Sequence, residues 1–183
     1  MAKPTTSLSK PQQDFITRQR LFFVATAAPD GRVNLSPKGL DTLKIMAPDR
    51  IVWLSLSGSG NETAAHLLEN DRMTLMFCAF EGKPGIIRAY GHARAIHPHD
   101  GEWDSLVGLF PSLPGTRQIF DVAIDLVQTS CGTGIPEFVF QKERAIEQLL
   151  PFYDEMDQAG LKAYWTKKNT VSLDGKPTGI FES

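Results

Sequence analysis

The segment Ser57-Gly-Ser-Gly-Asn-Glu-Thr63 has residue types suited to binding an anion. It joins a predicted strand to a predicted helix that begins near Asn61. Free backbone N–H groups and the helix dipole both favour negative charge at such a junction, so phosphate binding there is physically reasonable. The spacing matches neither a P-loop nor a dinucleotide-binding fingerprint, and a Ser- and Gly-rich loop before a helix is usually only a cap. Phosphate binding and simple capping are therefore both open for this segment.

A hydroxyl and an ammonium group occur together in Ser36-Pro-Lys-Gly39, at the end of the strand predicted for residues 33–38. A lysine at this place would meet an anion held by the Ser57–Thr63 loop if the fold brings the two segments together. The alternative is a solvated lysine before a turn. On this segment alone, the solvated lysine is the better interpretation.

The four histidines do not form a metal-binding pattern. His97 and His99 are close in sequence, but no third cluster of ligands accompanies them, so we interpret them as part of a turn after a strand. His66 lies within an apolar helical pattern and is interpreted as a helix-face residue rather than a base. The sequence therefore predicts no metal site.

Cys131 lies in the segment Gln128-Thr-Ser-Cys-Gly-Thr-Gly-Ile-Pro136, where Ser130 and two glycines give an exposed, adaptable backbone. A thiol becomes a nucleophile when neighbours lower its pKa, and the segment offers no obvious activating base. We therefore favour a loop that lies against a ligand or a partner subunit over a catalytic nucleophile.

The composition is that of an ordinary globular chain of 183 residues, with 42% hydrophobic residues and a net charge of −2. Such a balance gives no basic field for nucleic acid or an anionic membrane. The longest apolar runs are far shorter than the ~20 residues that cross a bilayer, and the N-terminus lacks the apolar core of a secretory signal. Two cysteines make no disulfide framework. We expect a cytoplasmic protein with no nucleic-acid or membrane partner.

Short apolar segments joined by turn residues occupy most of the chain. Pro29-Asp-Gly-Arg32 and Ala47-Pro-Asp-Arg50 supply turn chemistry for two hairpins. Gly91, inside a long strand, predicts a β-bulge. Pro151 and Gly160 predict that the region 143–168 is divided into two short helices. The predicted strands are 21–28, 33–38, 43–46, 50–57, 72–80, 86–97 and 118–128, and further helices are predicted for 11–20, 61–70 and 100–110.

Six or seven strands with few helices between them indicate an antiparallel sheet that curls or closes. We therefore expect a mainly β, α+β fold, in the form of a small barrel with flanking helices.

The order of these segments resembles the pyridoxamine 5′-phosphate oxidase family of flavin-binding split barrels, over residues 15–136. The stretch Ala65-His-Leu-Leu-Glu-Asn-Asp-Arg-Met-Thr-Leu-Met-Phe77 is the most specific part, because members commonly have a helix that ends in an Asn- or Asp-rich turn, followed by Arg and an apolar strand. The other matching segments are the hairpin Phe22–Lys38, the strand and loop Trp53–Thr63, and Tyr90-Gly-His-Ala-Arg94.

The resemblance implies an antiparallel six-stranded split β-barrel with Greek-key connections and flanking helices. It also implies FMN bound between two subunits of a homodimer, with the cofactor sites at the interface. The chain then divides into a flexible N-terminal arm (1–12), an FMN-binding split-barrel domain (13–136) and a C-terminal helical extension (137–183) packed on the barrel or on the dimer partner.

The same likeness assigns positions to the cofactor. Residues 33–38 would run along the flavin and its ribityl chain, Leu54 and Ser55 would lie beside the isoalloxazine, and residues 61–63 would take the phosphate. The segment Gln128–Pro136, which contains the Ser-Cys-Gly loop, would close over the flavin. The residues implied to bind FMN are Asn34, Leu35, Ser36, Lys38, Leu54, Ser55, Gly60, Asn61, Thr63, Ser130, Cys131 and Gly132.

Two departures from the family pattern bear on activity. Glu62-Thr63 stands where pyridoxamine phosphate oxidases usually carry an Arg-Lys pair, and a carboxylate there should repel phosphate. Backbone N–H groups, Asn61, Thr63 and Lys38 would have to compensate. The Arg-containing substrate segment of the vitamin enzymes is not recognisable in residues 137–183. Vitamin B6 oxidase activity is therefore not carried over.

The leading hypothesis is an FMN-dependent oxidoreductase in which the flavin itself carries out hydride transfer with a small substrate or a nicotinamide donor, and no side chain is assigned as catalytic. One alternative is a flavin-binding or storage protein without turnover. Another is a related split barrel that uses heme or a deazaflavin.

Overall fold

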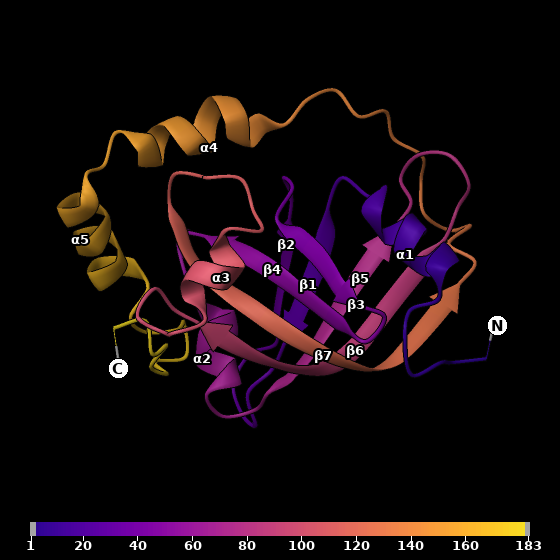
Figure 1. Ribbon diagram of the computed structural model, residues 1–183, viewed down its shortest axis with the longest axis horizontal. Coiled ribbons are helices and arrows are strands. Elements are labelled where there is room, and N and C mark those ends of the chain that lie inside the picture. Colours follow the sequence, from indigo (N-terminus) through magenta and orange to yellow (C-terminus); the bar gives the residue numbers. More distant parts are fainter. Residues whose placement is uncertain (1–2, 182–183) are drawn as a thin grey trace.

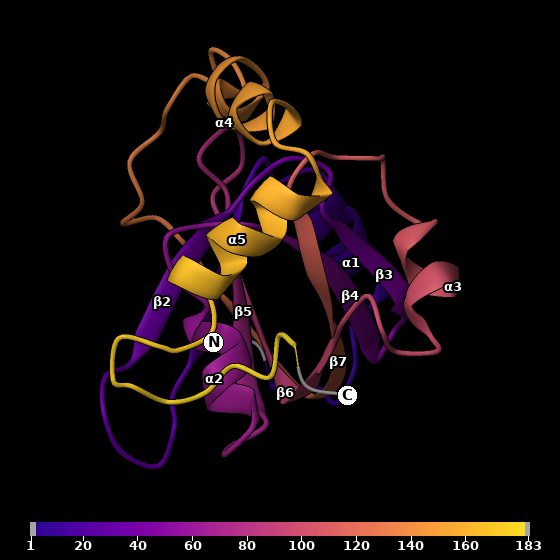
Figure 2. The ribbon, with the colours of Figure 1, turned by 90° about the vertical axis from the view of Figure 1, so that its left-hand side faces the viewer.

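The structure, a computed structural model, describes residues 3–181 as one antiparallel sheet with helices around it (Figures 1 and 2). The strands are β1 (Phe22–Thr26), β2 (Asn34–Lys38), β3 (Leu43–Ala47), β4 (Arg50–Leu56), β5 (Arg72–Cys78), β6 (Ile86–Ile96) and β7 (Thr116–Ser130). The helices are α1 (Lys10–Thr17), α2 (Glu62–Leu67), α3 (Trp103–Val107), α4 (Arg144–Asp154) and α5 (Gln158–Lys168). The mainly β architecture with flanking helices is confirmed.

The strand order across the sheet is β2-β1-β5-β6-β7-β4-β3, and every neighbouring pair is antiparallel. The expectation of six strands is wrong, because β3 pairs with β4 as a seventh, outer strand. The expected closure into a barrel is also wrong, since β2 and β3 are the two unjoined edges of the sheet within residues 3–181. Pro37 in β2 lacks the N–H that a further ladder partner would need, which suits an edge strand.

The open sheet curls around the larger of two apolar clusters. Phe22 on β1 and Trp53 on β4 are separated by three strands in the sheet, yet their ring centroids are only 6.0 Å apart. Trp53 also stacks on Phe120 of β7 at 4.4 Å, and Phe22 stacks on Phe77 of β5 at 5.9 Å. These offset and edge-on contacts add specific geometry to the burial of large apolar surfaces. The inner face of the sheet therefore closes on itself through side chains rather than through strand pairing.

The predicted bulge at Gly91 is confirmed. The register between β6 and β7 shifts at this point, which leaves Asp125 as an extra residue on β7. A Cβ atom at Gly91 would lie 1.9 Å from the backbone oxygen of Ala123. The two strands thus approach so closely here that only glycine fits.

Part of the segment expected to be a flexible arm lies against the sheet. Thr5 and Val127 exchange two backbone hydrogen bonds of 3.1 and 2.7 Å. β7 extends beyond the end of β4, which leaves a free strand edge for Thr5 to occupy. Leu8 is buried, and its N–H donates to the Pro48 carbonyl oxygen. Composition alone gives no signal for this docking, because the anchors are backbone groups and one leucine.

Two helices occupy the C-terminal extension, as predicted, but the expected break points are wrong. Pro151 lies inside α4, and Gly160 lies in the first turn of α5. The break falls between them because Asp157 caps α5 by accepting a hydrogen bond from the Gly160 N–H. α4 arches over the sheet, and α5 returns toward α2 (Figure 1). Among residues 3–181, no helix combines the length and apolarity needed to span a membrane.

We expect Gly91→Ala to destabilise the protein by about 3 kcal/mol or more, because the new methyl group meets backbone rather than a side chain that can move. Chemical denaturation measures the change. Gly101→Ala is the control, since a Cβ at Gly101 meets nothing within 4 Å. Equal stabilities for the two variants would contradict the close approach of β6 and β7.

Candidate functional site

A cavity of about 590 Å³ lies where β2, β4 and β7 meet the loop before α2. Strand periodicity explains part of its lining, because alternate residues of β2 share one face and so present Asn34, Ser36 and Lys38 together. Eight of the twelve predicted cofactor residues line it, namely Asn34, Leu35, Ser36, Lys38, Ser55, Gly60, Asn61 and Thr63. The structure therefore brings the two predicted polar segments to one place.

Leu54 lies outside this cavity. Ser55 faces the cavity, and successive strand residues point to opposite faces of a sheet. The Leu54 side chain accordingly packs in an apolar cluster with Ile96 and Ile119. Only the Ser55 half of the predicted pair is placed to contact a ligand in this cavity.

The Ser130–Gly132 loop also lies apart from the cavity of its own chain. Arg117, near the beginning of β7, lines the cavity, and Ser130 is the last residue of the same strand, 13 positions further on. Cys131 is exposed, and a hydrogen bond with the Thr133 hydroxyl lowers the pKa of its thiol. The expectation that no side chain in this segment lowers that pKa is therefore wrong.

A chain of hydrogen bonds fixes the polar wall of the cavity. The Asn34 amide donates to Thr63 Oγ1 at 3.1 Å and to Thr26 Oγ1 at 3.3 Å. Thr26 in turn lies 3.1 Å from Nδ1 of His66, which is buried. The Thr63 hydroxyl is thus oriented through a network that runs from His66 on α2 through Thr26 on β1 and Asn34 on β2, and so ties the first turn of α2 to both strands.

Asn61 is held from the opposite side. Its amide forms two hydrogen bonds with the Gln118 amide, with Gln118 Nε2 to Asn61 Oδ1 at 2.7 Å and Asn61 Nδ2 to Gln118 Oε1 at 3.3 Å. Both side chains are buried, so this pairing satisfies polar groups that have lost water. The loop before α2 is thereby fixed to β7.

Two cations, Arg117 and Lys38, line the cavity. No carboxylate among the described residues shifts the pKa of either one. Arg117 is 4% exposed and donates to the Gly60 carbonyl oxygen at 2.9 Å and to Ser55 Oγ at 3.2 Å. Lys38 Nζ lies 5.6 Å from the centroid of the Trp53 ring. Burial lowers the pKa of Arg117 to about 10 and, together with the charge of Arg117, lowers the pKa of Lys38 to about 8. The site is therefore electropositive and poorly solvated.

Sequence reasoning missed Arg117. An arginine at the beginning of a strand is ordinarily expected at the solvated end, with its charge in water. The local pattern contains no signal that β4 and the Gly58–Gly60 loop enclose it. Only the pairing of β7 with β4 places Ser55 within reach of its guanidinium.

The Glu62 carboxylate, expected to repel phosphate, is engaged elsewhere. Both of its oxygens accept from the Leu173 N–H, at 3.0 and 3.1 Å. Leu173 belongs to the C-terminal hairpin, residues 169–178, in which Val171 pairs with Pro177. A backbone donor from the extension thus offsets part of the negative charge at the cavity rim.

Further contacts bind the extension to the loop before α2. The Trp165 indole donates to Ser57 Oγ at 2.7 Å, and the Asn169 amide donates to the Gly58 carbonyl oxygen at 2.9 Å. Figure 2 shows α5 and the C-terminal hairpin in front of α2. The extension therefore forms an outer support for the cavity wall.

Ion pairs fasten the C-terminal hairpin. Asp174 accepts from the Arg32 backbone N–H at 2.7 Å and also pairs with the Arg32 guanidinium. Lys176 pairs with Asp30 at 2.6 Å and with Glu69 at 2.8 Å. These contacts join the hairpin to the β1–β2 turn and to the turn after α2, on two sides of the cavity.

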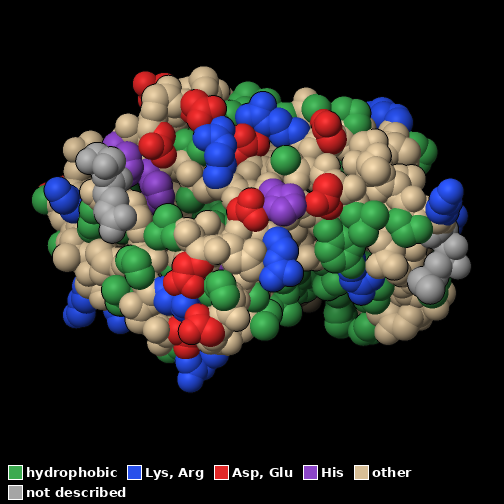
Figure 3. Space-filling model, turned by 90° about the horizontal axis from the view of Figure 1, so that it is seen from below, with side chains coloured by type: hydrophobic (Ala, Val, Ile, Leu, Met, Phe, Trp, Pro, Cys, Tyr) green, Lys and Arg blue, Asp and Glu red, His purple; other side chains and the backbone are tan. Residues whose placement is uncertain are grey.

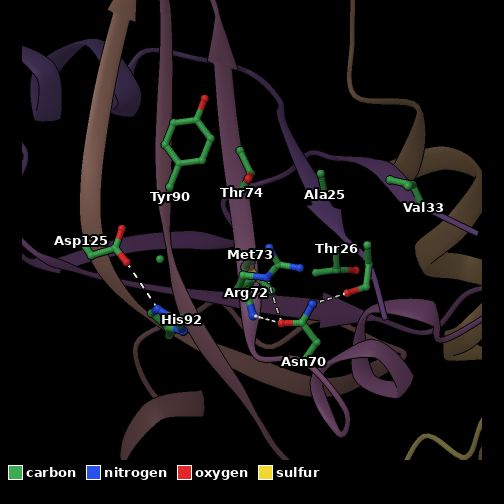
Figure 4. A pocket seen from close by; sticks show the side chains of 12 residues that line it. Ala25, Thr26, Val33, Asn70, Arg72, Met73, Thr74, Tyr90, His92 and Asp125 are labelled. Carbon is green, nitrogen blue, oxygen red and sulfur yellow. Dashed lines mark hydrogen bonds and ion pairs between the residues drawn. The ribbon is translucent and has the colours of Figure 1, made fainter. Parts of the chain in front are cut away.

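A second pocket, of about 370 Å³, lies on the outer face of β1, β5 and β6 (Figure 4). Its charged groups are engaged with one another or with neighbouring polar groups: His92 lies 2.8 Å from Asp71 and 3.4 Å from Asp125, and Arg72 donates to Asn70. The Asp71 hydrogen bond raises the pKa of His92. His92 in this pocket therefore has carboxylate partners, unlike Lys38 and Arg117 in the first cavity.

Acidic and basic side chains intermingle on the underside of the molecule (Figure 3). Among the ion pairs of the described residues, Arg50 and Arg94 both pair with Asp121, and Arg94 also pairs with Glu102. Across the part of the chain that the structure describes, no three His, Cys, Asp or Glu side chains are grouped to hold a metal ion. The larger cavity is therefore the candidate site.

A curled antiparallel sheet with flanking helices and an electropositive cavity beside the loop before α2 defines a small, mainly β protein. The chain belongs to the pyridoxamine 5′-phosphate oxidase family, whose sequence model matches residues 8–131.

One curated relative is the pyridoxamine 5′-phosphate oxidase family protein ustO of Aspergillus flavus, 34% identical over 187 residues, covering 93% of this chain and 75% of the relative. Two solved structures share the fold, each with a TM-score of 0.52. HupZ of Group A Streptococcus is 16% identical, covering 68% of this chain and 94% of that protein. A Lactobacillus delbrueckii protein assigned to the pyridoxamine 5′-phosphate oxidases is 15% identical, covering 68% and 95%.

We expect Glu62→Gln to speed amide hydrogen exchange at Leu173 by roughly tenfold, since a charge-assisted hydrogen bond becomes a weaker neutral one. Exchange measured by NMR at Leu173 tests this, with the exposed Glu137→Gln as the control. Unchanged exchange in Glu62→Gln would show that the carboxylate does not hold the C-terminal hairpin.

Proposed function

We propose that this protein binds FMN in the larger cavity and acts as an FMN-dependent oxidoreductase on a small substrate. The observation that carries the proposal is the buried Arg117 together with the partly buried Lys38, in a cavity that is also lined by hydroxyl, amide and apolar groups and in which Glu62 and Arg32 are bound to the C-terminal hairpin. A phosphate-bearing aromatic cofactor needs this combination of charge, hydrogen-bond donors and apolar walls. Membership in a family named for an oxidase supports the same conclusion.

The residues of the chain fit the proposed cofactor. The loop 61–63 would hold the phosphate, with Lys38 supplying positive charge. Asn34 orients the Thr63 hydroxyl at the cavity, and the amide pairing of Asn61 with Gln118 fixes the loop to β7. The bound flavin would supply the hydride chemistry, while the protein binds and orients it. The hydrogen bonds from the Leu173 N–H to the Glu62 carboxylate offset part of the negative charge that would repel a phosphate here.

We further propose a homodimer in which the second copy completes each site. Val33 and Leu35, at the cavity rim, are 74% and 63% exposed, so an apolar wall is left uncovered within one chain. The Ser130–Gly132 loop lies at the far end of β7 and would reach a cavity only from a partner copy. Twofold symmetry would give two equivalent sites.

Sedimentation velocity of the FMN-loaded protein tests the homodimer, and we expect a dimer at low micromolar concentration. Leu35→Glu should weaken the dimer, because it places a charge in the apolar rim. Leu109→Glu, an exposed leucine outside the cavity, is the matched control. A monomer that still retains FMN would refute the shared site.

We expect Lys38→Ala and Thr63→Ala each to weaken FMN binding by at least about tenfold, ~1.4 kcal/mol, through loss of a charged or hydroxyl contact to phosphate. Riboflavin, which lacks the phosphate, should bind equally well to the variants and the parent. Titration followed by flavin fluorescence gives both affinities. Lys44→Ala and Thr74→Ala are controls outside this cavity. Equal losses for FMN and riboflavin would assign both residues to the fold instead.

The visible spectrum and a reduction test separate the alternatives. Flavin bands in the purified or reconstituted protein support the proposal, whereas a Soret band would indicate heme, and failure to take up flavin would point to a deazaflavin or another ligand. Anaerobic NADH or NADPH that bleaches the flavin would support an oxidoreductase. A bound flavin that no donor reduces would favour a flavin-binding or storage protein.

A further inference from the structure

Arg117 is a buried cation with unused hydrogen-bonding capacity. Its two Nη groups donate to neutral acceptors, the Gly60 carbonyl oxygen and Ser55 Oγ. Its Nε is buried and has no partner among the described residues. Burying a guanidinium without a counter-charge is costly, and a charged ligand is the simplest way to offset that cost.

Two tyrosines of the C-terminal extension only partly offset the effect of burial on Arg117. Tyr153 and Tyr164, whose rings pack edge-on at 5.8 Å, act to raise the pKa of Arg117, against the larger effect of burial. Tyr153 is buried against Gly115, where a Cβ would lie 2.5 Å from its ring. Burial raises the pKa of Tyr153, so this phenol supplies no full negative charge near neutral pH. A full counter-charge must therefore come from the cavity.

Lys38 adds a second positive charge to the same cavity. Its ammonium lies over the Trp53 ring. Burial and the positive charge of Arg117 together lower the pKa of Lys38 to about 8. Two cations that repel each other in a poorly solvated space are stabilised together by a dianion more than by a monoanion.

We propose that Arg117 and Lys38 together form a dianion site that selects a phosphate monoester, with Arg117 as its principal anchor. The proposal rests on the proposed function, which it deepens by naming the residue and the charge that determine ligand choice. A phosphate monoester is mostly dianionic above pH 6, and its oxygens can accept hydrogen bonds from several N–H groups of a guanidinium. A neutral flavin would leave both cations unbalanced.

The charge balance in the cavity also couples FMN binding to the protonation of Lys38. In the empty cavity Lys38 loses its proton as the pH rises through about 8, whereas a bound dianion would favour the protonated form. FMN binding near pH 8 should therefore take up a proton, and FMN affinity should fall as the pH rises further. Arg117 keeps its charge over this range, since its pKa is about 10.

Arg117→Gln tests the anchor, with binding of FMN, riboflavin and inorganic phosphate each measured directly. We expect FMN affinity to fall by roughly a hundredfold and riboflavin affinity to change less than threefold, while Arg117→Lys recovers at least tenfold of the FMN loss. Arg72→Gln, in the outer pocket, is the control. Circular dichroism establishes that each variant is folded.

Calorimetry on the unmodified protein keeps the proposal testable if Arg117→Gln does not fold. FMN titrations at pH 8 in buffers of different ionisation enthalpy should show proton uptake, which riboflavin should lack and Lys38→Met should abolish. No difference between FMN and riboflavin in proton uptake would overturn the dianion site.

The outcomes separate this inference from the proposed function. If Lys38→Ala weakens FMN binding but Arg117→Gln leaves it within threefold, the anchor role is wrong and the proposed FMN site stands. If Arg117→Gln weakens FMN and riboflavin equally, Arg117 supports the fold and the inference is also wrong. If the unmodified protein binds neither flavin, the proposed function itself fails.

Discussion

The burial of Arg117 without a carboxylate is the constraint around which the candidate site is arranged. Removing a guanidinium from water costs several kcal/mol unless hydrogen bonds and a counter-charge replace its hydration. Ser55 on β4 and Gly60 before α2 provide two of the hydrogen bonds, whereas no carboxylate among the described residues shifts the pKa of Arg117. Strand pairing and loop conformation thus position this side chain, and a counter-charge would have to come from the cavity.

An open, curled sheet suits this arrangement better than a closed barrel. Because β2 and β3 are not joined, the edge strand β2 can lie along the cavity and place Lys38 over Trp53 on β4. The Phe22–Trp53 contact supplies the cohesion that hydrogen bonding across the gap would otherwise give. The open edge thus leaves β2 free to line the cavity, while side-chain packing in the core holds β1 and β4 together.

Much of the fold and part of the candidate site could be predicted from short-range features of the sequence. The two hairpins and the bulge at Gly91 follow from turn residues, alternation and glycine, which act over a few neighbouring positions. Asn61, Thr63 and Lys38 were identified because each lies in a short polar segment at the end of an element. Arg117 was missed because its environment is created by strand pairing between residues 62 positions apart.

Other errors have the same physical origin. Leu54 and Ser55 are adjacent in sequence, but the alternation of a β-strand sends one into the core and the other into the cavity. The charge of Glu62 suggested repulsion, yet a backbone N–H more than a hundred residues away engages both carboxylate oxygens. A motif therefore indicates which groups are available, whereas tertiary contacts decide which of them face a ligand.

The C-terminal extension belongs to the physical description of the site although the family model ends at residue 131. Trp165, Asn169 and Leu173 contact the loop before α2 or the first residue of α2. The match to the Aspergillus flavus relative omits only 7% of this chain, about 13 of its 183 residues, so it includes most of the extension. The two solved structures cover only about two thirds of the chain. The sheet supplies the common framework, and the extension holds the loop before α2 in place and engages the Glu62 carboxylate at the rim of the cavity, so residues outside the family model contribute to the shape and charge of the candidate site.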